Sequence, residues 1–301
     1  MEKIGIFFAL SGDIYQPSYR SDLIRICDVC FVYINDNIKN LINNGYLVEC
    51  HVLLNYQNEL IPNLVESIKE IFLKYSINIE IEVKKIDIIK QEFLNNIGYY
   101  DDYDIDYPNY YSNNRTKIIF DSILEKKPSL WVQIFQFLYQ SNKNLKYDFF
   151  IRSRLDVFLN DEFIYLSLIK RFTSAYNLSF QGENCSQGYA IVPHIIFDGL
   201  DFGVNVRDEC FVLDESAVHT CFSNLYYICD LELSYYNEHH ILSNLLLKNH
   251  IITLASQEAD NMFTYRSQVC DKFSDDFMKR KENLNYIAAE LATEKNPNHV
   301  F

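Results

Sequence analysis

The sequence predicts an α/β fold in which buried strands alternate with amphipathic helices. Residues 4–10 are almost continuously apolar, which is typical of a strand covered on both faces in a parallel sheet. Apolar residues then recur at helical spacing between residues 20 and 44, and the sequence Asn43-Asn44-Gly45 predicts where that helix ends. The chain therefore begins with strand, loop and helix.

The same alternation continues through the first third of the chain. A second buried run covers residues 47–54, apolar positions at helical spacing follow between residues 64 and 72, and residues 77–83 alternate as a strand does. Together these segments predict a β-α-β-α-β unit. The first third is thus Rossmann-like in plan, and we expect helices on both faces of its sheet.

Length, composition and charge restrict the class of protein. A chain of 301 residues can bury a substantial core, and 49% hydrophobic with 15% aromatic residues is the profile of a packed globular protein. The formal net charge of −14, without a Lys/Arg cluster, opposes binding to a phosphate backbone. We expect no nucleic-acid partner.

The cysteines and the N-terminal residues bear on location. Eight cysteines are scattered along the chain, and the C-x-x-C pair Cys27 and Cys30 falls inside a helical pattern without a second pair at zinc-site spacing. These patterns predict buried or helix-face thiols. Residues 1–12 are too short an apolar segment for a signal peptide or a membrane span. We therefore expect a reducing, cytoplasmic location and no membrane span.

The middle and end of the chain continue the α/β pattern after an acidic, Tyr-rich segment at residues 99–114, which predicts an exposed loop. Further helices are expected at 117–124, 130–138, 215–229 and 238–248, and further strands at 189–192, 210–213 and 251–254. No linker interrupts the series. We expect one domain over residues 1–301, with halves at 1–160 and 161–301.

The segment 147–159 is the most informative for chemistry. Its apolar strand runs directly into Arg152, Arg154 and Asp156. Open α/β sheets bind ligands at the carboxyl ends of their strands, and alternate residues of a strand project to one face. An aspartate with two guanidinium groups there would suit a metal-bound diphosphate. An Arg–Asp ion pair at a strand end is the other interpretation.

Residues 147–156 have the form Tyr-Asp, three apolar residues, then Arg-x-Arg-x-Asp. This strand resembles the variant D-x-D motif of GT-A glycosyltransferases from bacterial and large-virus surface-polysaccharide pathways, with Arg154 where D-x-D has its first carboxylate. The resemblance extends over most of the chain through loose matches at Ser11-Gly12, Arg20, Trp131, Gln133, Asp208-Glu209-x-Phe211 and Asn237-Glu238.

The resemblance implies a GT-A-like domain whose N-terminal half binds a nucleotide sugar and whose C-terminal half binds an acceptor. The implied reaction moves a hexosyl or deoxyhexosyl group from a nucleotide-diphosphate sugar to a hydroxyl of a glycan or glycoconjugate. Asp156 would hold Mn²⁺ or Mg²⁺ on the departing diphosphate. An aspartate base would favour a direct, inverting displacement.

The resemblance, applied position by position, implies which residues form the donor site. Ser11, Gly12 and Arg20 would contact the nucleotide or its phosphates, with Gly12 allowing close backbone approach unless it serves a turn. Arg152 and Arg154 would join them.

The resemblance also assigns the acceptor cleft. Asp208 would be the general base or an acceptor ligand, with Glu238 nearby at a helix N-terminus, where the helix dipole also favours a carboxylate. Asp214 competes with Asp208 but fits the N-cap of the helix that follows.

Rival sites and rival functions remain open at the level of sequence. Residues 101–106 contain two formal D-x-D matches that follow no buried strand, and His239 and His240 adjoin Glu238. A nucleotidyltransferase would share the sheet but normally uses two metal carboxylates. A non-catalytic carbohydrate-binding protein is suggested by the many Tyr and Phe rings, which stack on sugars and also fill cores.

Overall fold

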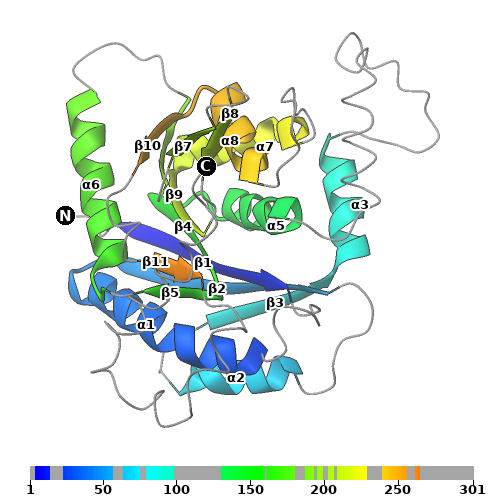
Figure 1. Ribbon diagram of the computed structural model, residues 1–301, viewed down its shortest axis with the longest axis vertical. Coiled ribbons are helices and arrows are strands. Elements are labelled where there is room, and N and C mark those ends of the chain that lie inside the picture. Colours follow the sequence, from blue (N-terminus) through cyan, green and yellow to red (C-terminus); the bar gives the residue numbers. More distant parts are fainter. Residues whose placement is uncertain are drawn as a thin grey trace.

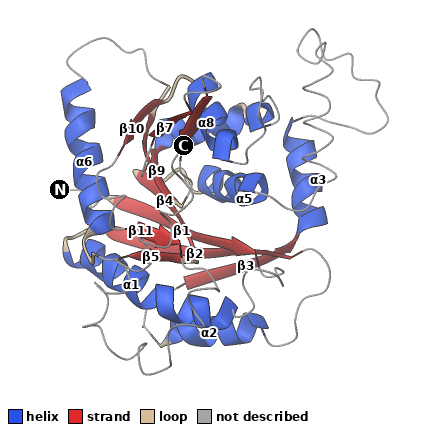
Figure 2. Ribbon diagram, in the orientation of Figure 1, coloured by secondary structure: helices blue, strands red, loops and turns tan. Residues whose placement is uncertain are grey.

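A central sheet of seven strands, in the order β10-β6-β9-β4-β1-β2-β3, organises the computed structural model of the protein (Figure 1). The sheet carries helices on both faces (Figure 2), which confirms the predicted α/β class. The structure describes residues 4–13, 23–56, 64–74, 79–97, 130–159, 161–179, 187–192, 195–198, 203–206, 209–228, 239–255 and 262–264.

The predicted β-α-β-α-β unit is present. It comprises β1 (Gly5–Asp13), α1 (Leu23–Asn43), β2 (Leu47–Tyr56), α2 (Leu64–Leu73) and β3 (Ile79–Lys85). β1 pairs in parallel with β2, and β2 pairs in parallel with β3. The buried apolar runs therefore mark parallel strands, as expected from their continuous hydrophobicity.

The stop signal after α1 works as the sequence predicted. Gly45 has φ 93°, a left-handed conformation that glycine adopts without steric cost. Its backbone N–H donates to the carbonyl of Ile42, and that of Tyr46 donates to Leu41. These bonds satisfy carbonyls at the end of the helix and turn the chain into β2.

The second part of the chain adds predicted strands to the same sheet and predicted helices around it, while the helix predicted at 117–124 lies outside the described residues. These strands and helices are α5 (Leu130–Lys143), β4 (Phe149–Arg154), β6 (Tyr189–Val192), β9 (Cys210–Asp214), α7 (Glu215–Ser223), α8 (His239–Lys248) and β10 (Ile252–Ala255). β4 pairs in parallel with β1 but antiparallel with β9. α7 is shorter than predicted, and a 3₁₀ turn at Leu225–Ile228 follows it.

Several elements had no prediction from the sequence. They are α3 (Ile86–Ile97), β5 (Val157–Leu159), α6 (Ile164–Ser179), β7 (Ile195–Asp198), β8 (Gly203–Val206) and β11 (Met262–Thr264). α3 begins directly where β3 ends, without a loop to announce it. β5 and β11 form one two-stranded sheet and β7 and β8 another. The β5–β11 pair joins segments far apart in the chain, whereas β7 and β8 are neighbours in the sequence.

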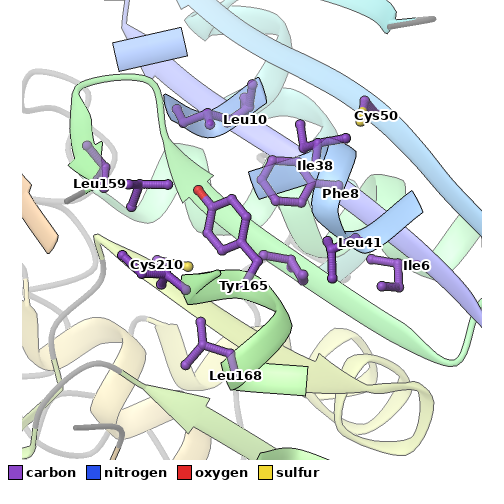
Figure 3. Packing of buried hydrophobic residues seen from close by; sticks show 14 of the residues in the cluster. Ile6, Phe8, Leu10, Ile38, Leu41, Cys50, Leu159, Tyr165, Leu168 and Cys210 are labelled. Atoms are coloured by element: carbon purple, nitrogen blue, oxygen red, sulfur yellow. The ribbon is translucent and has the colours of Figure 1, made fainter. Parts of the chain in front are cut away.

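Alternate residues of β1 supply two different hydrophobic cores. Ile6, Phe8 and Leu10 pack with α1, α2 and α6, whereas Phe7 and Ala9 pack with α3, α5, α7 and α8. Figure 3 shows the first core, where the ring of Tyr165 lies against Phe8 with ring centroids 4.9 Å apart. Because both faces of β1 are covered, only its ends can carry polar chemistry.

Four cysteines in the described ranges, Cys30, Cys50, Cys210 and Cys221, are buried. Burial raises the pKa of Cys50 and Cys210 to about 12, so both stay protonated at neutral pH. The prediction of buried thiols is confirmed for Cys30. The side chain of Cys27 lies outside the described residues. None of the helices that the structure describes is long and apolar enough to cross a membrane.

Asp214 links β6, β9 and the start of α7, and it confirms the predicted N-cap. Its Oδ1 accepts hydrogen bonds from the backbone N–H of Ala217 at 2.8 Å and of Tyr189 at 3.1 Å. Burial raises the pKa of this carboxyl, and the same backbone donors oppose that rise. One oxygen atom therefore satisfies a helix donor and a strand donor together.

Replacing Asp214 should destabilise the junction. We expect Asp214→Ala to lower the free energy of unfolding by about 1–2 kcal/mol, the usual cost of losing an N-cap. Asp214→Asn keeps an acceptor oxygen at the same position, so it should lose less than half as much. Urea unfolding of the variants followed by circular dichroism measures both. Equal losses in the two variants would contradict the capping role.

Candidate functional site

The candidate site lies where the connections of the sheet reverse direction. From β1 the chain proceeds to β2 on one side, whereas β4 lies on the other side of β1, so the strand order there is β4-β1-β2. Ser11 on β1 is in register with Leu53 on β2 and Arg154 on β4. Open α/β sheets bind ligands beyond the carboxyl ends of the strands at such a switch point. The structure therefore brings together Ser11, Gly12, Arg152 and Arg154.

Arg152 is held by hydrogen bonds beneath α5. Its side chain is fully buried, its Nε donates to Ser11 Oγ at 2.9 Å, and its Nη2 donates to Gln133 Oε1 at 2.6 Å. The guanidinium also lies over the Phe211 ring, 5.6 Å from the ring centroid. Arg152 thus joins β4, β1 and α5. Its predicted contact with a nucleotide stays a prediction.

A band of buried polar side chains continues this arrangement under α5. Asn55, near the end of β2, donates from Nδ2 to Gln136 Oε1 at 3.3 Å. Asn55 Oδ1, Gln136 Nε2 and Trp131 Nε1 are buried and have no hydrogen-bond partner among the described residues. The face of the sheet that is apolar at Phe7 therefore becomes polar at the carboxyl ends of the strands.

Sequence reasoning missed Asn55 and Gln136. A signal was present in both, because each is an amide within an otherwise apolar run. Sequence alone could not show that one ends β2 and the other lies on α5 directly above it. Glu209, next to the predicted base, is also buried, and its backbone carbonyl accepts from Arg154 N at 2.9 Å.

Arg154 forms a bidentate ion pair with Asp156. Its Nε donates to Oδ1 and its Nη2 to Oδ2, both at 2.9 Å. The side chain of Arg154 is 18% exposed and that of Asp156 only 4%. Such fork-to-carboxylate geometry fixes both side chains. The structure therefore contains the Arg–Asp ion pair that was the other interpretation of this segment.

The position of Asp156 requires a correction. The sequence placed it at the end of the buried strand, on one face with Arg152 and Arg154. In the structure β4 ends at Arg154, and Asp156 lies in the turn that leads to β5. The turn bends the carboxylate back onto Arg154, while Arg152 bonds to α5 and β1.

Gly12 belongs to β1, so the structure does not show the alternative in which Gly12 forms a turn after the strand. It does not have the positive φ that favours glycine. A Cβ atom at Gly12 would lie 2.8 Å from Leu155 Cδ1 and 3.4 Å from Leu155 Cβ. The missing side chain lets Leu155 pack against β1, which sets the path of the turn that carries Asp156.

The residues around Asp156, as the structure describes them, do not fit a divalent cation. Both carboxylate oxygens already accept hydrogen bonds from a guanidinium, and a cation there would lie beside that positive charge. Within the described ranges no group of three or more His, Cys, Asp or Glu side chains could hold a metal ion. The predicted Mn²⁺ or Mg²⁺ on Asp156 remains a prediction from the sequence.

The other predicted site residues cannot be placed. Arg20, Asp208, Glu238 and the acidic segment 101–106 lie outside the described residues. His239 and His240 open α8, but their side chains are not described.

The chain matches no protein-family model. It also matches no curated protein. Mouse xyloside xylosyltransferase 1 in its apo form is a similar solved structure, with 7% sequence identity, a TM-score of 0.40 and 85% of each chain covered. HddC from Yersinia pseudotuberculosis shares 10% identity with a TM-score of 0.32, over 71% of this chain and 78% of HddC. Neither similarity, at these TM-scores, bears on the chemistry of this chain.

The packing of Gly12 predicts a coupling with Leu155. We expect Gly12→Ala to lower the free energy of unfolding by about 1–3 kcal/mol, because the added methyl group overpacks the contact. In a Leu155→Val background, which lacks the clashing Cδ1 atom, the same change should cost less. Chemical unfolding of the wild type, both single variants and the double variant measures the coupling. An identical cost in both backgrounds would refute the packing explanation.

The bond from Arg152 to Gln133 predicts a large effect of a nearly isosteric change. Gln133→Leu removes the acceptor of a buried guanidinium, so we expect a loss of about 2–3 kcal/mol in unfolding free energy. Gln91→Leu, at an exposed position of α3, is the matched control and should change it by about 0.5 kcal/mol or less. Urea midpoints of the two variants provide the comparison, and similar midpoints would count against the bond.

Proposed function

We propose that the chain is a glycosyltransferase that moves a sugar from a nucleotide-diphosphate donor to a hydroxyl of a glycan or glycoconjugate. One observation carries the proposal. A partly exposed guanidinium, that of Arg154, lies at the switch point of an open α/β sheet, in register with Ser11. That is where such folds bind nucleotide phosphates. Residues 147–156 also resemble the Arg-x-Arg-x-Asp strand of GT-A glycosyltransferases, and this resemblance is our reason for proposing that the bound nucleotide carries a sugar.

The donor side of the reaction needs positive charge beside the departing diphosphate. Arg154 would supply it directly, and Arg152 would hold Ser11 and β4 in place from beneath. Gly12 and Arg20 complete the proposed donor site, Gly12 through its backbone at the end of β1, because Leu155 fills the space beside its Cα. The bond from the anomeric carbon to the diphosphate oxygen breaks, and both electrons leave with the nucleoside diphosphate.

The acceptor side needs a base that takes the hydroxyl proton as the new carbon–oxygen bond forms. Asp208 is our choice, because it directly precedes Glu209, whose carbonyl accepts a hydrogen bond from the backbone of Arg154. Glu238 is the second candidate, immediately before α8. Attack from the side opposite the diphosphate would invert the anomeric centre.

Incubation of the full chain with nucleotide sugars tests the proposal. Nucleoside diphosphates and nucleotide sugars should raise the melting temperature, because they bind only the folded state. Released nucleoside diphosphate identifies sugar transfer, whereas released pyrophosphate would indicate a nucleotidyltransferase. A chain that binds free glycans but no nucleotide in any condition would be a carbohydrate-binding protein, contrary to the proposal.

The assignment of the base predicts a specific kinetic defect. Asp208→Asn keeps the shape and removes the proton acceptor, so turnover should fall by about 10²–10⁴ with little change in donor affinity. Glu238→Gln is the comparison and should retain most of its activity. Steady-state kinetics with a saturating donor measures both variants. Normal turnover in Asp208→Asn together with an inactive Glu238→Gln would exchange the two roles.

A further inference from the structure

The ion pair of Arg154 and Asp156 presents its positive partner to solvent. The guanidinium side chain is 18% exposed and the carboxylate side chain 4%. Arg154 is therefore the member of the pair whose side chain a ligand can reach more readily. The carboxylate lies behind it in the turn, with both oxygens accepting hydrogen bonds from Nε and Nη2.

We propose that this site binds the nucleoside diphosphate through the guanidinium of Arg154 without a divalent cation, and that Asp156 is a positioning residue for Arg154. The inference rests on the proposed function and specifies how that site recognises its donor. It replaces the usual pairing of a carboxylate, a metal ion and a diphosphate by a direct pairing of guanidinium and diphosphate.

The backbone on each side of Arg154 keeps this guanidinium at the edge. Arg154 N donates to the carbonyl of Glu209 at 2.9 Å, and Leu155 N donates to the carbonyl of Ser11 at 3.0 Å. β4 is thus held on both sides up to the residue where it ends. A side chain on such a fixed backbone loses little further freedom when it binds a ligand.

The chemistry of the pair favours an anion over a cation. The planar fork of a guanidinium matches the oxygens of a phosphate as well as those of a carboxylate. A divalent cation would have to displace Arg154 from both oxygens of Asp156 and would then lie beside its positive charge. A diphosphate needs neither change, because a guanidinium has five N–H donors and the bonds to Asp156 come from two of its three nitrogens.

Calorimetric titration of the full chain with UDP and with GDP, in EDTA and in Mn²⁺, tests the inference. We expect whichever nucleotide binds to do so with the same Kd in both buffers, within about threefold. Arg154→Ala should weaken binding by about tenfold or more in both buffers. Arg154→Lys keeps the charge without the fork and should lie between. It also serves as the second variant if Arg154→Ala does not fold.

Asp156→Asn separates a positioning residue from a metal ligand. If Asp156 positions Arg154, the variant should weaken binding equally with and without Mn²⁺. If Asp156 instead ligates a cation, the loss should be confined to the Mn²⁺ buffer, which would overturn the inference. Lys170→Ala removes one positive charge from the exposed side of α6 and should bind as the wild type does.

The outcomes distinguish this inference from the proposed function. Binding of UDP, GDP or their sugars that occurs only in Mn²⁺ would overturn cation-free recognition and leave the glycosyltransferase proposal standing. Failure of all these ligands to bind in either buffer would overturn both. Cation-independent binding that survives in both Arg154 variants would retain a nucleotide site but refute the role of Arg154.

Discussion

The fully buried guanidinium of Arg152 constrains the site more than any other single group. A charge taken out of water is tolerated only when its N–H groups are hydrogen-bonded, because their desolvation is otherwise uncompensated. Ser11 on β1 and Gln133 on α5 accept two of these bonds. Three elements distant in the sequence are thereby tied at the point where the sheet reverses direction. The positions of Gly12 and Arg154 follow from that tie.

The arrangement of the sheet explains why polar groups gather at the carboxyl ends of β1 and β2. Alternate residues of β1 enter two separate cores, so no face of the strand is available to a ligand. Buried polar side chains lie where these parallel strands end, at Ser11 on β1 and Asn55 on β2, and a separate one, His51, lies in the middle of β2. α5 covers these ends with its own amides. The result is a polar layer between an apolar core and the edge of the sheet.

The two arginines of the Arg-x-Arg-x-Asp segment have different surroundings, and we assign them different roles. Arg152 is buried and stabilises the junction of strands and helix. Arg154 is partly exposed and paired with an aspartate that lies deeper than it does. One positive charge therefore stabilises the fold, and the other lies where a diphosphate would bind. The sequence of the motif alone does not distinguish these two roles.

Local patterns in the sequence determined the order of the elements. Continuous apolar runs indicated β1 and β2, helical spacing indicated α1 and α5, Gly45 marked the end of α1, and Asp214 marked the start of α7. These signals succeed because they depend on neighbours within one turn or one strand. α3 was missed because it follows β3 without a loop or cap, and β5 and β11 because each is short and pairs only with the other.

Tertiary contacts alone decided the site. The sequence could place Arg152, Arg154 and Asp156 together, but the turn after Arg154 depends on Leu155 packing over Gly12, some 140 residues earlier in the chain. It could not show that Asp156 would fold back onto Arg154, since a carboxylate two residues from an arginine has several partners open to it until the backbone is fixed. Burial then selected between them: a carboxylate that is withdrawn from water must be paired, and the nearest guanidinium on that fixed backbone is Arg154.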